Sequence, residues 1–83
     1  MLASPATETR YIVQTYILDK KSNPVPSMAH ICETQMAAER RAEKVMNSGK
    51  IIGVHLICQT GIPEFDEYEE PVVMLALGRV PPE

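Results

Sequence analysis

The chain has 83 residues, which is room for one small domain and not for two hydrophobic cores. Eight Lys and Arg residues stand against 11 Asp and Glu residues, and the net charge of −3 argues against a nucleic-acid binder that relies on a basic surface. No apolar run approaches the roughly 18 residues that span a bilayer, no secretory signal is recognisable, and two cysteines are too few for a disulfide framework. We therefore expect a cytoplasmic protein with free thiols and neither a nucleic-acid nor a membrane partner.

The N-terminal part predicts a tail followed by a strand. Residues 1–9 are small and polar without periodicity, so the single folded domain is expected to be 10–83. Tyr11–Leu18 is rich in β-branched and aromatic residues and is apolar on both faces, which favours a central strand. Asp19–Asn23 has the composition of a turn.

The next segment contains two prolines and predicts a strand at the edge of the sheet. Pro24 and Pro26 favour extended backbone and deny two donors to a ladder. A short strand over roughly Ser27–Cys32 is expected to pair back on the first strand. The same residues could instead form an extended loop that leads to the helix.

A helix is predicted within Glu33–Gly49, the one segment with a clear helical period. Thr34 suits the N-cap, so the helix should begin within about two residues of it and end near Asn47. Gly49 suits the left-handed residue that closes a helix. Glu39 and Glu43 interrupt the basic residues Arg40, Arg41 and Lys44, which indicates a solvated face. The apolar stripe consists of Ala38, Ala42, Val45 and Met46.

Two further strands are predicted after the helix. Lys50–Gln59 should place Ile52, Val54, Leu56 and Cys58 toward the helix and Ile51, Gly53, His55 and Ile57 on the other face. Thr60–Pro71 is expected to be a connection, and Val72–Val80 to be the last strand, with Gly78 as a bulge or close-contact point.

These elements predict an α+β fold, in which an antiparallel sheet of three to four strands in the order β-β-α-β-β carries one helix on one face. The other face has no predicted cover. In the last strand, Val73, Leu75 and Leu77 should share one face, and Val72, Met74 and Ala76 the other. We expect an interaction face on the uncovered side, formed by Met74, Val72, Ala76 and His55.

The candidate metal and catalytic residues give little support to either chemistry. His30, Cys32, His55 and Cys58 are zinc ligands by type, but His55 and Cys58 should point to opposite faces of their strand, so no metal is predicted. Cys32 precedes the helix without an identifiable acid–base partner. No catalytic motif occurs, and the chain is not expected to be an enzyme. A solvated hairpin loop is the expected setting of the five acids of the connection, Glu64, Asp66, Glu67, Glu69 and Glu70.

Several short motifs occur together along the chain, at Tyr11-Ile12-Val13-Gln14-Thr15, Ala42-Glu43, Thr60-Gly61, Pro63-Glu64, Glu67-Tyr68 and Glu70-Pro71-Val72-Val73. They resemble the motifs of a family of short, uncharacterised bacterial proteins, whose members have a Y-V-V-Q strand, an alanine-rich helix and an E-Y-x-E-P-V-V hairpin. The likeness spans about Arg10 to Pro81 and departs from the family at Ile62 and Asp66. It implies a small bacterial domain and no particular function.

Two better-known families resemble parts of the chain. Tyr11-x-Val13-Gln14, with a helix that ends at Gly49, is similar to the opening of the SPOR peptidoglycan-binding domain, although residues 59–71 lack that family's second helix. The strand–helix–strand–strand order resembles dodecin, a flavin-storing oligomer, but its stacking tryptophan is absent here. No cofactor is therefore expected.

The sequence thus favours a small cytoplasmic binding or protein-interaction module without catalytic activity, whose partner is another protein or a second copy. The alternative is a small-molecule-binding domain, formed across a homodimer.

Overall fold

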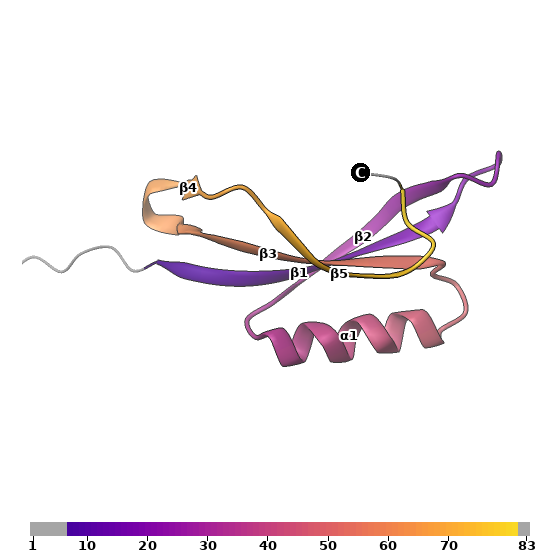
Figure 1. The fold of residues 1–83 in the computed structure, drawn as a ribbon, viewed down its shortest axis with the longest axis horizontal. Helices are drawn as coiled ribbons and strands as arrows, with labels where there is room; N and C mark the ends of the chain where they lie inside the picture. Colours follow the sequence, from indigo (N-terminus) through magenta and orange to yellow (C-terminus); the bar gives the residue numbers. More distant parts are fainter. Residues whose placement is uncertain (1–6, 82–83) are drawn as a thin grey trace, which may run out of the picture.

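The computed structural model describes residues 7–81 and contains one α-helix, five strands and a short 3-10 turn in this range (Figure 1). In chain order these are β1 (Glu8–Leu18), β2 (Pro24–Cys32), α1 (Gln35–Asn47), β3 (Gly53–Ile62), the 3-10 turn η1 (Pro63–Phe65), β4 (Glu67–Tyr68) and β5 (Val72–Gly78).

The strands form one antiparallel sheet with the neighbour order β2-β1-β3-β4, and β5 also pairs with β3. The helix lies against one face of this curled sheet, as Figure 1 shows. The predicted α+β class and the β-β-α-β-β order are therefore confirmed. The two-residue strand β4 is an addition to them, because the predicted connection turns back on itself and pairs with the end of β3.

The helix prediction is confirmed at both ends. The Thr34 hydroxyl accepts a hydrogen bond from the backbone N–H of Ala37 at 3.1 Å and so satisfies one donor of the first turn. At the other end, the Ser48 N–H donates to the Val45 carbonyl, and Gly49 follows with a φ of +79°.

The strand β1 begins earlier than the sequence indicates, and β3 begins and ends later. β1 begins at Glu8, inside the predicted tail, because Glu8 and Thr9 pair with Gly61 and Thr60. The prediction of a tail is wrong for these two residues, and residues 1–6 lie outside the described range. β3 begins at Gly53 instead of the predicted Lys50. It continues beyond its expected end to Ile62, because Gly61 pairs with Glu8 and Ile62 pairs with Glu67 of β4.

The proline-rich segment is a strand and not a loop. β2 begins at Pro24, earlier than predicted, and pairs with β1 along its whole length. A bulge interrupts this pairing where Ser27 and Met28 together oppose Thr15. There the Thr15 hydroxyl accepts from the Met28 N–H at 2.9 Å and donates to the Met28 carbonyl at 3.0 Å.

A second bulge changes which residues of β5 share a face. Leu75 pairs with Leu56 and Val73 with Ile57, so Met74 is an extra residue in β5. The predicted grouping of Val72 with Ala76 is therefore wrong. Strict alternation places them together, but the bulge moves Val72 to the helix-covered side, opposite Cys58.

Gly78 is a close-contact point, as predicted. Its φ is +66°, and a Cβ atom there would collide with the Ile52 carbonyl oxygen. The Arg79 N–H donates to that carbonyl at 2.8 Å, which holds the chain after β5 beside the start of β3.

The hydrophobic core lies between α1 and the sheet. It consists of five buried side chains, of which the largest are Val13, Val54 and Leu56, and α1 contributes only Ala38 and Ala42. The predicted orientation of Val54 and Leu56 toward the helix is thus confirmed. Because the two alanines are small, the helix lies close to the sheet, and the core remains small.

Candidate functional site

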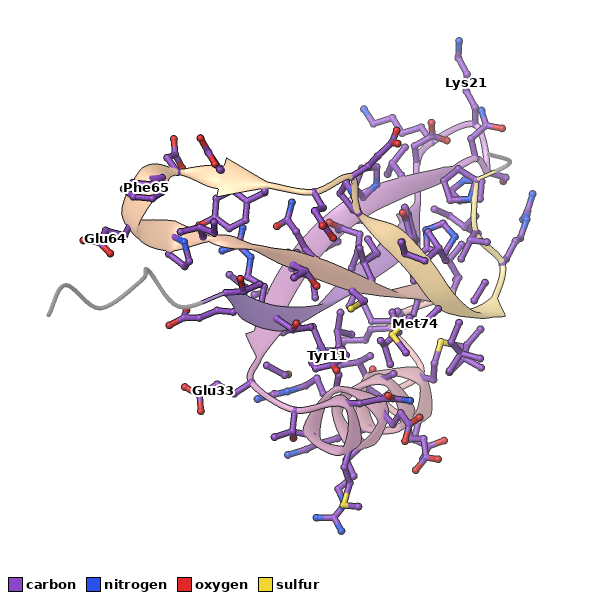
Figure 2. All side chains as sticks on the ribbon, turned by 60° about the vertical axis from the view of Figure 1, so that its left-hand side comes forward. Tyr11, Lys21, Glu33, Glu64, Phe65 and Met74 are labelled. Atoms are coloured by element: carbon purple, nitrogen blue, oxygen red, sulfur yellow. The ribbon has the colours of Figure 1, made fainter. Side chains whose placement is uncertain are left out.

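A continuous run of five exposed apolar residues lies on β5. We call Val72, Val73, Met74, Leu75 and Ala76 the β5 surface; the first four are 39–61 % exposed, and Ala76 is also exposed. Met74 lies on the strand that runs along one side of the sheet in Figure 2. Contiguous exposed apolar side chains of this kind are typical of interaction sites.

The backbone of β5 is also available. Among residues 7–81, β5 pairs only with β3, so its outer edge carries backbone groups without a strand partner. The strand, VVMLALG, contains neither a charged residue nor a proline. Charged residues, prolines and bulges are usual means by which an edge strand is protected from pairing with another chain. The edge of β5 has a bulge at Met74 but carries neither charge nor proline, so it retains much of the character of a strand-acceptor site.

His55, the remaining residue of the predicted interaction face, is 8 % exposed and contributes little to that surface. Its Nδ1 atom lies 2.8 Å from the Tyr16 hydroxyl, and the two rings meet edge to face with centroids 5.1 Å apart. Burial raises the pKa of the Tyr16 phenol above its ordinary value of 10.0, because the charged phenolate would lose its solvation. The pair is thus a buried polar contact of the uncovered face.

The four His and Cys residues do not come together. Cys32 and Cys58 both pair with Tyr11, from opposite sides of β1, and both thiols are free. His30 shares their face, whereas His55 lies on the other face of the sheet. No group of three or more His, Cys, Asp or Glu residues within residues 7–81 is arranged to hold a metal ion.

A groove between α1 and β2 is the largest hollow found in the described part of the chain, with a volume of about 860 Å³. It exists because β2 meets the beginning of α1 and then diverges from the C-terminal half of the helix (Figure 1). The bulge of β2 opposite Thr15 lies where β2 begins to diverge from the helix, and a bulge bends the strand that contains it. Thr15, Val45 and Ile51 line the inner part of the groove and are buried or half-buried.

Positive charge is concentrated around this groove. Arg40, Arg41, Lys44 and Lys50 line it, which is half of the eight Lys and Arg residues of the chain. Of the ten Asp and Glu residues within residues 7–81, only Glu43 lines it with them. We call this site the basic groove. Such a segregation of charge in a protein with a net charge of −3 favours a negatively charged partner at this position.

The opposite charge is concentrated in the loop between β3 and β5. Residues 63–70, which we call the acidic hairpin, hold five carboxylates and no basic residue, and all of them are exposed. Figure 2 shows Glu64 and Phe65 at the tip of this hairpin. Phe65 is 56 % exposed. The prediction of an exposed hairpin loop is confirmed.

Strand pairing and a side-chain stack hold the acidic hairpin in place. Tyr68 pairs with Gly61 in the sheet, and the Glu69 N–H donates to the Thr60 carbonyl at 2.8 Å. The Arg10 guanidinium carbon lies 4.7 Å from the Tyr68 ring centroid, in the geometry of a cation–π contact. Asp66 accommodates the turn with a φ of 53°.

The basic groove is not predicted from the sequence, which indicates only a solvated helix face for Arg40, Arg41 and Lys44. Their signal in the sequence is the excess of cations in the C-terminal half of the helix. The groove itself depends on the path of β2, which sequence periodicity does not encode.

Comparison with known proteins found no matching family model, curated protein or solved structure. Among the described residues, no helix is both long and apolar enough to cross a membrane.

Proposed function

We propose that this chain is a non-catalytic protein-interaction module that binds an extended segment of a protein partner along the edge of β5. The observation that carries the proposal is the exposed, uncharged edge of that strand. Strand addition supplies backbone hydrogen bonds, and the exposed side chains of the β5 surface supply apolar contacts on both faces of the added strand. We propose a cytoplasmic location, which the two free thiols support.

The bulge at Met74 determines which side chains of β5 a partner strand would contact. The side chains of Val72 and Leu75 lie on the helix-covered side, and those of Val73 and Ala76 on the uncovered side. A partner strand beside β5 would therefore contact apolar side chains above and below the sheet. The partner strand should therefore carry apolar side chains on both of its faces.

The test compares two methionine variants. Met74→Glu places a carboxylate on the β5 surface, where Met74 is 43 % exposed, whereas Met36→Glu places one on a methionine of α1 that is 61 % exposed. Each tagged variant and the wild type are used to capture proteins from the cell that makes the chain, followed by quantitative mass spectrometry. We expect Met74→Glu to lose its specific partners by about tenfold or more, because a charge at the centre of an interface is strongly unfavourable.

The Met36→Glu variant should retain the same partners as the wild type, and both variants should remain folded by circular dichroism. In the purified complex, amide hydrogen exchange of residues 72–78 should slow when the partner is bound. Retention of every partner by Met74→Glu, or unchanged exchange in β5, would contradict the proposal.

A further inference from the structure

We infer that the basic groove binds the acidic hairpin of a second copy of this chain. This contact uses neither β5 nor its edge, so it stands independently of the proposed function. Complementary charge identifies the occupant. Four cations and one carboxylate line the groove, and the hairpin presents five carboxylates without a cation. Oppositely charged surfaces of this kind steer association and fix its orientation.

The hairpin also offers a side chain for the inner part of the groove. Phe65 stands at the tip, is 56 % exposed, and has Glu64 and Asp66 on either side in the sequence. The groove has an apolar interior that includes Val45 and Ile51, with charged residues around it. An aromatic anchor within an apolar pocket, surrounded by charged contacts, is a common form of interface centre. The volume of about 860 Å³ leaves room for this side chain.

The hairpin cannot reach the groove of its own chain. Figure 1 shows the β3–β4 hairpin at one end of the sheet and the C-terminal half of α1 toward the other. Backbone pairing of Gly61 with Tyr68 and of Ile62 with Glu67 fixes the hairpin at its own end. The contact is therefore intermolecular. Because each copy has one hairpin and one groove, two copies related by a two-fold axis form both contacts at once and close into a dimer.

The experiment exchanges the charges of the two surfaces. The groove variant carries Arg41→Glu and Lys50→Glu, and the hairpin variant carries Glu64→Lys, Glu67→Lys and Glu70→Lys, so that each surface changes the sign of its net charge. All five positions are exposed, so the fold should be retained. Asp66 is kept because few residues tolerate its positive φ. The control variant carries Lys20→Glu and Lys21→Glu in the exposed β1–β2 turn, and its net charge equals that of the groove variant.

Sedimentation should give the wild type and the control a mass near twice 9.2 kDa. Their dissociation constant should rise about tenfold or more when salt is raised from about 50 to about 500 mM. The groove variant and the hairpin variant should each be monomeric alone, because their hairpins and grooves then have like charge. Mixed in equal amounts, they should form a heterodimer, because both contacts again join opposite charges.

The inference would be overturned if the mixture of the groove variant and the hairpin variant stayed monomeric. It would also be overturned if the wild type were monomeric, and the groove would then be open to a small anionic molecule. If the wild type is a dimer and each of the two variants alone still forms that dimer, the interface lies elsewhere on the chain. If Met74→Glu alone abolishes that dimer, the self-association belongs to β5, and the inference about the groove fails while the proposed function stands.

Discussion

The two faces of the sheet differ in how they are closed. On the covered face, α1 lies over Val13, Val54 and Leu56, which are 0–1 % exposed, and nearly all of the stabilising apolar contact is concentrated there. The uncovered face has the buried, hydrogen-bonded Tyr16–His55 pair, while Ile31 on the same face is 64 % exposed. One face therefore stabilises the domain, and the margins of the other remain available for contact with other molecules.

The largest effect should come from the covered face. Leu56→Ala removes the largest fully buried side chain and leaves a cavity beneath α1, so it should lower the free energy of unfolding by about 2–5 kcal/mol. In a core of this size such a loss is a large share of the total stability. Urea unfolding followed by circular dichroism measures it.

The matched control is Ile31→Ala on the uncovered face. This side chain is mostly exposed, so its removal should change the free energy of unfolding by less than about 1 kcal/mol. Equal costs for Leu56→Ala and Ile31→Ala would contradict the distinction between the faces, because they would show that Ile31 is buried in solution.

A smaller effect is expected at the buried polar pair. Tyr16→Phe leaves the Nδ1 atom of His55 buried without its partner, so it should cost about 1–3 kcal/mol. Tyr11→Phe is the control on the covered face, where no hydrogen bond of the Tyr11 hydroxyl is found within the described residues, and it should cost less than about 0.5 kcal/mol. If the two variants unfold at the same urea concentration, the Tyr16–His55 contact contributes nothing to stability.

The smallest effect is a dependence of stability on alkaline pH. Because the pKa of Tyr16 is raised in the folded chain, the folded state holds this proton at a pH where the unfolded state has released it. Stability should therefore be unaffected below pH 10.0 and fall as the pH rises above it. Tyr16→Phe should fall less than the wild type between about pH 9 and about pH 11. Parallel declines would show that Tyr16 does not cause the loss.

Much of the fold follows from local patterns. Thr34, Gly49 and the spacing of Ala38 and Ala42 are sufficient to predict the helix and the face that it buries. Strand ends are less well encoded, because Glu8 and Thr9 are extended only through their pairing with β3. The side of the sheet on which Val72 lies could not be predicted from the sequence. Met74 is one extra residue in β5, and it reverses the alternation of side chains for the residues that precede it.

The candidate sites divide in the same way. By itself, the sequence determined that five carboxylates lie in one exposed hairpin, because this property belongs to contiguous residues. The last strand is uncharged only because it ends at Gly78, whereas the predicted strand continues to Val80 and includes Arg79. Only the tertiary structure decided that β5 lies at an edge and that His55 is buried against Tyr16. It alone decided that β2 diverges from α1 and opens a basic groove. These features depend on contacts between residues far apart in the chain, and periodicity within one segment carries no information about them.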